Sequence, residues 1–158
     1  MQDQRLAFIK NDMFLLLNNL SPDSKANWGK MNAQQMMEHV ADFFDVSTEK
    51  IKFPLTIPEE HLPKYKAFLY SDKEFKENTK APAEVLGEEP LPLRTANLEA
   101  AINKLKIAVD DFFIYFKDDP NKLTMHPAFG LLNFDEWILL HYKHVTHHWK
   151  QFGLIKTV

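Results

Sequence analysis

The chain has 158 residues, and its 19 basic and 22 acidic side chains give a formal net charge of −3. It contains no cysteine, which excludes disulfides, thiolate metal sites, iron–sulfur clusters and a cysteine nucleophile. The slight acidity argues against a nucleic-acid surface, and no apolar run approaches the roughly 18–20 residues that cross a bilayer. The start of the sequence lacks a signal-peptide pattern. We therefore expect residues 1–158 to form a single cytoplasmic domain that acts on a small-molecule substrate, with no nucleic acid or membrane as partner.

Long proline-poor segments carry apolar residues at helical spacing. They predict helices over Gln4–Asn18, Asn32–Lys52 and Leu98–Phe116, and a fourth helix between Asn133 and Gly153. The second and fourth helices begin with a capping-box pattern, in which Asn is followed three residues later by Gln35 or Glu136.

The middle third of the chain is rich in proline. Six of the nine prolines lie between residues 53 and 93: Pro54, Pro58, Pro63, Pro82, Pro90 and Pro92. Proline removes a backbone donor and clashes with the preceding turn, so this segment cannot form one long helix. We expect a proline-rich insertion at about 53–93, with one short helix from Glu59 to Leu69. No useful β-alternation is present, so the sequence predicts an all-α fold, a four-helix bundle with a long crossover connection.

Four histidines lie within about two turns of the fourth helix: His141, His144, His147 and His148. At about 100° per residue, His141, His144 and His148 share the face of Trp137, so they are expected to point inward. His147 falls on the flank of that face. His144 and His148 are four residues apart, a spacing that lets imidazoles on adjacent turns bind one metal ion.

His39 lies on the apolar stripe of the second helix, so it also faces the core. Alone, it could be a core histidine satisfied by a hydrogen bond. Three inward imidazoles together would need several mutual hydrogen bonds, and a shared metal removes that requirement. His39, His144 and His148 therefore form the predicted metal site.

Three histidines without cysteine match the open type of metal site, in which water or substrate completes the coordination. Imidazole suits zinc, nickel, iron and copper, so the ligands indicate a divalent transition metal such as Zn, Ni or Fe without choosing one. Gln35 and Gln151 could orient ligands, or be ordinary polar residues at the bundle ends. His141 could act as an acid or base, line a pocket or replace a ligand. His126 is expected to shape a loop, and His61 to be exposed in the insertion.

Two motifs resemble the DinB/YfiT-like superfamily of damage-inducible four-helix-bundle metalloproteins. The run KMNAQQMMEH at residues 30–39 resembles its second-helix signature, and HVTHHWKQ at 144–151 resembles its last-helix motif, where a histidine pair precedes a glutamine. HPAFG at 126–130, Trp137 and QFG at 151–153 resemble an uncharacterised branch. The resemblance places metal ligands at His39, His144 and His148. It also implies an up-up-down-down type of bundle with a long crossover, and frequently a homodimer.

Three functions follow from this resemblance and this site. The leading hypothesis is a metal-dependent thiol S-transferase, because some relatives bind a low-molecular-weight thiol such as bacillithiol or mycothiol at the metal. A bound metal would lower the pKa of the thiol and hold a thiolate beside an electrophile. Other relatives are glutathione-linked isomerases or metal-dependent hydrolases, and a hydrolase would use the metal to lower the pKa of water. The third hypothesis is a non-enzymatic, metal-binding or stress-related bundle protein.

Overall fold

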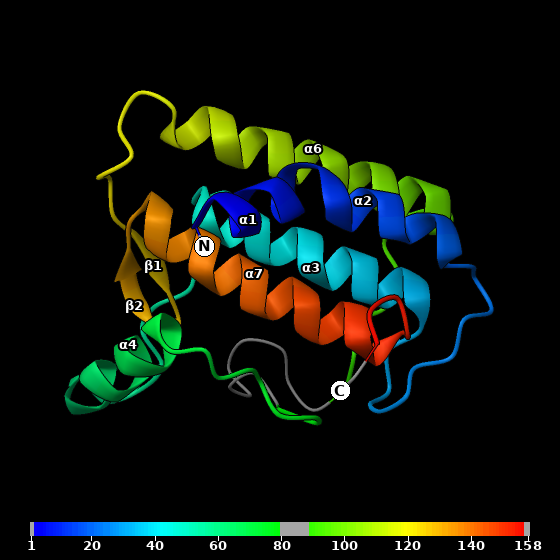
Figure 1. Ribbon diagram of the computed structural model, residues 1–158, viewed down its shortest axis with the longest axis horizontal. Coiled ribbons are helices and arrows are strands. Elements are labelled where there is room, and N and C mark those ends of the chain that lie inside the picture. The colour runs from blue at the N-terminus through cyan, green and yellow to red at the C-terminus, as the bar shows by residue number, and fades with distance from the viewer. Residues whose placement is uncertain (1, 80–88, 157–158) are drawn as a thin grey trace.

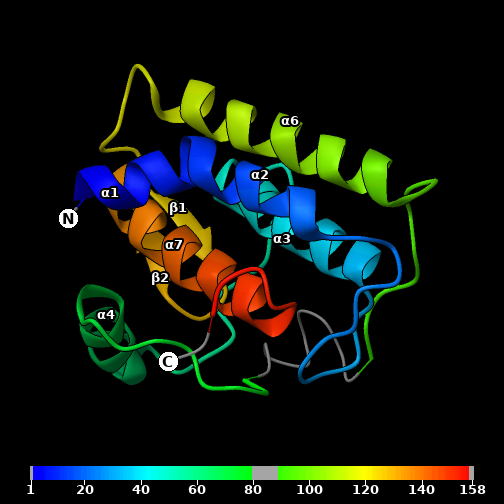
Figure 2. The ribbon, with the colours of Figure 1, turned by 45° about the vertical axis from the view of Figure 1, so that its right-hand side comes forward.

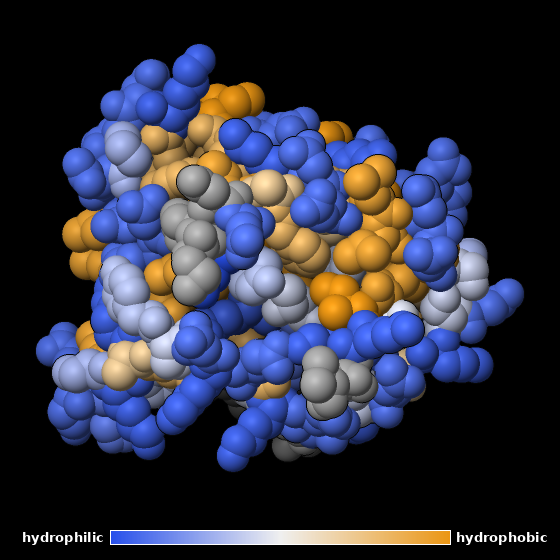
Figure 3. Space-filling model, viewed as in Figure 1, coloured by the Kyte–Doolittle hydropathy of each residue, from blue (hydrophilic) through white to orange (hydrophobic). Residues whose placement is uncertain are grey.

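The computed structural model describes residues 2–79 and 89–156 (Figure 1). The described chain is mostly helical and has one small antiparallel sheet of two strands. Residues 80–88 of the predicted insertion, with Pro82, lie outside the described part. None of the described helices is long and apolar enough to span a membrane. Hydrophobic residues gather toward the middle of the face in Figure 3, over the long helices, with hydrophilic residues around them.

The first predicted helix is one continuous helical rod of changing pitch. Its segments are α1 (Gln2–Ala7), the π-helical η1 (Phe8–Asp12), α2 (Met13–Leu16) and the 3₁₀-helical η2 (Leu17–Asn19). The indole Nε1 of Trp149 donates a hydrogen bond of 3.0 Å to the carbonyl of Met13, directly after the π-helical turn. This bond anchors the rod to the last helix.

The other three long helices begin at the predicted residue or one residue after it. They are α3 (Ala33–Ser47), α6 (Leu98–Phe116) and α7 (Phe134–Gln151). Asn32 and Asn133 each form a complete capping box, and Asn97 caps α6 through the amide of Ala100.

Helix α3 ends five residues earlier than the predicted Lys52. The hydroxyls of Ser47 and Thr48 donate to the carbonyls of Phe44 and Asp45, and Glu49 adopts a φ of 64°. These side-chain bonds and the left-handed residue stop the helix, whereas apolar spacing alone would continue it.

The insertion contains the expected short helix, and a hairpin follows α6. The short helix consists of η3 (Glu59–His61) and α4 (Leu62–Tyr70). Strands β1 (Thr124–His126) and β2 (Gly130–Leu132) pair antiparallel. The all-α expectation is wrong in this detail, because strands of three residues are too short to show alternation. The Trp137 indole donates to Thr124 Oγ1, and that hydroxyl donates to the Ser47 carbonyl, so the hairpin is tied to both α3 and α7.

Helices α3 and α6 run parallel. Asp42 of α3 lies 3.7 Å from Lys104 of α6, and Lys50, which follows the end of α3, pairs with Asp111 further along α6. Helices α3 and α7 run antiparallel, as the contacts of His39 with His148 and of Ser47 with His141 show.

The order of directions of the four rods is therefore up, down, down, up (Figures 1 and 2). The predicted up-up-down-down order is wrong. The short connection 20–32 turns the chain back at one end, so α3 opposes the first rod. Helix α6 then starts at the same end of the molecule as α3, which makes the two helices parallel.

A buried acidic clamp fixes the part of α3 that carries His39. The Glu38 carboxylate, only 1% exposed, accepts hydrogen bonds from the backbone amides of Arg94 (3.1 Å) and Thr95 (2.9 Å) and from the Thr95 hydroxyl. Arg94 also binds Asp42 through two bonds of 3.1 and 2.8 Å. Burial raises the pKa of Glu38, but these hydrogen bonds outweigh it and hold that pKa below its usual value.

Replacement of Glu38 by Gln should lower the free energy of unfolding by roughly 2–4 kcal/mol at pH 7, because an amide cannot accept all of these bonds. The folded-state pKa of Glu38 is lowered, so its contribution is present above about pH 4.5 and is lost as the pH falls further. Urea unfolding at pH 7 and pH 3 measures both effects. Exposed Glu60→Gln is the control and should change stability by less than about 0.5 kcal/mol. Equal losses in the two variants would contradict the clamp.

Candidate metal centre

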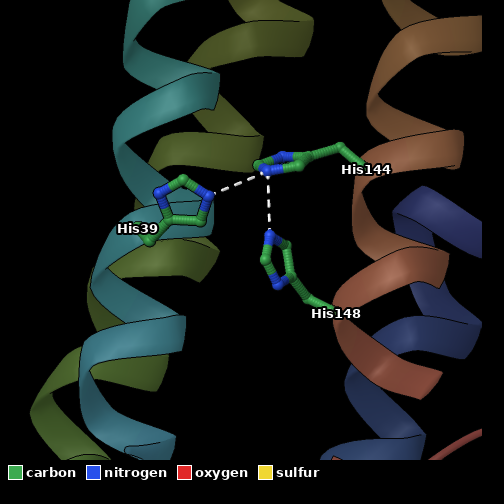
Figure 4. Close-up of side chains that lie close together, drawn as sticks. All are labelled: His39, His144 and His148. Atoms are coloured by element: carbon green, nitrogen blue, oxygen red, sulfur yellow. Dashed lines mark hydrogen bonds between the residues drawn. The ribbon is translucent and has the colours of Figure 1, made fainter. Parts of the chain in front are cut away.

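Three histidine nitrogens converge between α3 and α7. His144 Nε2 lies 3.0 Å from His39 Nε2 and 3.1 Å from His148 Nε2, and one nitrogen from each ring lies within 4.8 Å of the others. Figure 4 shows the rings of His144 and His148 on adjacent turns of α7, pointing toward His39 on α3. The structure thus brings together the three histidines that the sequence selects.

The three rings differ in burial. His148 is 6% exposed, whereas His39 and His144 are half-buried.

The three rings are neutral at physiological pH. Burial lowers the pKa of His39 to about 4, and it lowers the pKa values of His144 and His148 well below the usual range. Each ring also disfavours a positive charge on its neighbours. Neutral imidazole is the form that donates a lone pair to a metal, so the site is held in its ligating state.

Gln151 fixes the proton of His148. Its side-chain Nε2 donates a hydrogen bond of 2.9 Å to the Trp28 carbonyl, which orients the amide. Its Oε1 then lies 2.7 Å from His148 Nδ1 and can only accept. His148 therefore carries its proton on Nδ1 and presents the Nε2 lone pair to the cluster.

Hydrogen bonds among the three rings cannot satisfy both short contacts. His148 Nε2 has no proton, so the contact of 3.1 Å requires a proton on His144 Nε2. That single proton points to His148 and cannot make a second linear hydrogen bond across the contact of 3.0 Å with His39. If His144 Nε2 is instead unprotonated, it faces the lone pair of His148. A cation that accepts all three lone pairs removes the conflict, so the donor set fits a divalent transition metal.

His39 differs from His148 in the support of its second nitrogen. Its Nδ1 is buried and makes no hydrogen bond in the described structure. Only the cluster contact constrains the tautomer of His39, whereas Gln151 determines that of His148.

The two glutamines have different roles. Gln35 Oε1 accepts from the Asn32 amide to complete the capping box, and its Nε2 donates to the Leu91 carbonyl. Gln35 thus forms the predicted capping box and is an ordinary polar residue at the helix end, one of the two alternatives for it, because its position in the first turn turns its amide toward that end. Gln151 makes the expected contact with a histidine of the cluster.

His141 is a core residue. It is 1% exposed and stacks on Phe44, with ring centroids 3.8 Å apart, and on Trp137 at 5.2 Å. The Ser47 hydroxyl donates to the Phe44 carbonyl, so it accepts from His141 Nε2 at 3.2 Å. With this proton committed and the ring enclosed, the geometry gives no support to an acid or base role for His141.

The remaining histidines also lie outside the cluster. His126 is in β1, where its Nδ1 accepts from the amides of Ala128 (3.0 Å) and Phe129 (3.1 Å) and so shapes the hairpin turn. This is the structural role expected for His126, within a strand rather than a loop. His61 is exposed, as expected.

Aromatic residues that the sequence analysis did not select border the cluster. The Phe43 ring lies edge-on to His39 and His144, with centroids 5.1 Å from each. Trp28 packs 5.4 Å from His147, which lies 5.0 Å from His148. The position of Phe43 one turn after His39 could have indicated its contact. No local signal could have indicated Trp28, because it lies in an irregular segment about 120 residues before His148.

These features define a mainly helical protein with a half-buried cluster of three histidines between antiparallel helices. Residues 6–154 match the model of the DUF1569 family, described as a protein of unknown function, and the chain belongs to this family. Comparisons with curated proteins and with solved structures found no match.

The stability of the hairpin should depend on pH through His126. Burial lowers the pKa of His126 to about 3 from an ordinary value of 6.5, so below pH 6.5 the unfolded chain binds a proton that the folded chain does not. His126 alone should lower the free energy of unfolding by about 1.4 kcal/mol for each unit that the pH falls between about pH 6 and pH 4.

His126→Asn keeps a short acceptor for the turn but does not titrate. Urea unfolding at pH 7, 6 and 5 should show a shallower fall in stability for this variant than for the wild type. Parallel pH profiles would contradict the assignment of a neutral, bonded imidazole at residue 126.

Proposed function

We propose that this protein binds a divalent transition metal through His39, His144 and His148 and acts as a thiol S-transferase. The observation that carries this proposal is the convergence of three neutral ring nitrogens, one of which has its lone pair directed to the centre by Gln151. Such an ion, when bound, would supply a Lewis acid that lowers the pKa of a coordinating group.

Long helical segments with a long connection between α3 and α6 are compatible with the resemblance to DinB/YfiT-like proteins, although the order of their directions differs from the one that the resemblance implies. We propose that the first rod, α3, α6 and α7 are the four helices of such a bundle, with residues 48–97 as its crossover. Two helices provide the three ligands, which leaves room for a substrate in the remaining coordination position. Zinc, nickel and iron all suit three imidazoles.

The surroundings of the cluster favour a thiol over water as the nucleophile. A small thiol ionises near pH 8.5, so a modest lowering of its pKa yields the thiolate without a general base. Water needs a much larger shift and is helped by a nearby base. The carboxylates beside His39 are committed, Asp42 to Arg94 and Glu38 to the amides of residues 94 and 95.

The residues around the cluster suit an apolar co-substrate. Phe43 makes T-shaped contacts with both His39 and His144 and provides an apolar wall beside these rings. An electrophile with an apolar body would pack against this wall and hold its reactive carbon near the thiol sulfur. In the transfer, a sulfur–carbon bond forms, the leaving group departs, and the thiol proton passes to solvent.

Loss of a ligand should release the metal. We expect His39→Ala and His144→Ala to weaken binding of zinc by about 100-fold or more, because two imidazoles remain where three were available. Elemental analysis of the untagged protein measures the bound metal, and competition with a chromophoric chelator then measures the affinity for zinc. His61→Ala is the matched control and should bind zinc like the wild type. Equal weakening in His39→Ala and His61→Ala would refute the site.

Thiol binding can be tested with the cobalt-substituted protein. Titration with a small thiol should produce a sulfur-to-cobalt charge-transfer band in the near ultraviolet, because the thiol enters the open position. An unchanged spectrum would reject the transferase and favour a hydrolase or a structural metal. Failure of the protein to bind any divalent metal would favour a non-enzymatic bundle protein.

A further inference from the structure

We infer that the irregular segment of Asn27, Trp28 and Gly29, which precedes α3, positions a ligand of the proposed metal centre. It orients the Gln151 amide, and in the metal-free protein that amide fixes the tautomer of His148 that can bind a metal. Trp28 and Gly29 are thus positioning residues. This inference rests on the proposed function, because it assigns a role toward the same three histidines.

The segment is bonded to the end of α7 at several points. The Asn27 amide donates to the Gln151 carbonyl at 2.7 Å, and the Asn27 side chain donates to the Lys150 carbonyl at 3.3 Å. The Trp28 carbonyl accepts from Gln151 Nε2 at 2.9 Å. Gln151 is only 4% exposed, so water cannot readily replace these partners.

The donors and acceptors along this chain of hydrogen bonds fit one orientation of the Gln151 amide. The Trp28 carbonyl can only accept, so it selects the amide nitrogen of Gln151 and leaves Oε1 to face His148 Nδ1 at 2.7 Å. With the amide turned over, an N–H group would face Nδ1 and the His148 proton would move to Nε2. A proton there blocks the lone pair that a metal needs. The main-chain carbonyl of Trp28 thus determines the tautomer of His148, which lies about 120 residues later in the sequence.

Gly29 makes room for this arrangement. It has a φ of +81°, and a Cβ at this position would lie 2.8 Å from Gln151 Nε2. The amide is the end of a flexible side chain, so it could move aside without disturbing the core. That movement would break its bond to Trp28 and release the constraint on His148.

Gly153 provides a matched control in the same region. Its φ is +71°, close to that of Gly29, but a Cβ there would meet nothing within 4 Å. Alanine at either position carries a similar backbone strain. Only alanine at residue 29 collides with Gln151, so a comparison of the two variants separates backbone strain from the position of the amide.

The test compares Gly29→Ala with Gly153→Ala. Both should lower the thermal midpoint of the metal-free protein through backbone strain, and Gly29→Ala should lower it further because it also loses the bond between Gln151 and the Trp28 carbonyl. In chelator competition, Gly29→Ala should bind zinc about 10–100-fold more weakly than the wild type, and Gly153→Ala should bind within about threefold of it. Nitrogen-15 NMR of the metal-free protein should show His148 with its proton on Nδ1 in the wild type and in Gly153→Ala, and a tautomer mixture in Gly29→Ala.

Two substitutions of Gln151 test the same claim by rescue. Gln151→Leu removes the acceptor and should weaken zinc binding as much as Gly29→Ala. Gln151→Glu keeps an acceptor for His148 Nδ1, so it should retain the Nδ1 proton and bind zinc at least about 10-fold more tightly than Gln151→Leu.

The outcomes separate this inference from the proposed function. If the wild type does not bind zinc, the proposed metal site is wrong and this inference is wrong with it. If the wild type binds zinc and Gly29→Ala binds it equally well, the metal site stands and the positioning role is overturned. If Gln151→Leu binds zinc as tightly as the wild type, His148 does not need an acceptor at Nδ1, which also overturns the inference.

Discussion

The approach of three uncharged imidazole nitrogens, within 4.8 Å of one another across two antiparallel helices, is the constraint on which the remaining structure depends. Burial makes a positive charge on these rings unfavourable. Their own hydrogen bonds cannot satisfy all of their contacts. The three rings therefore stabilise one another little, and interactions outside the cluster hold them in place.

Those outside interactions lie in irregular segments. On one side, Glu38 accepts backbone hydrogen bonds from the end of the insertion and so fixes the turn of α3 that carries His39. On the other side, Gln151 joins His148 to the segment before α3. Segments without regular structure thus set the geometry of a histidine cluster whose residues all lie on helices. This explains how ordinary helices can hold a defined cluster.

The partners of each histidine distinguish the structural rings from the rings of the proposed metal site. His141 donates to Ser47, and His126 accepts from two backbone amides, so both are satisfied by the fold itself. The rings of the cluster instead meet one another through nitrogens that lack complementary partners. Burial alone does not separate these groups, because His141 is more buried than His148.

The sequence by itself determined the long helices, their caps and the identity of the three converging histidines. These are local properties: Asn32 caps its own helix, and a spacing of four residues puts His144 and His148 on one face wherever α7 lies. Only the tertiary structure decided the direction of α3 and α6, the short hairpin, and the different fates of Gln35 and Gln151. Each of these depends on partners far away in the chain, such as the carbonyl that orients Gln151, and periodicity carries no information about such partners.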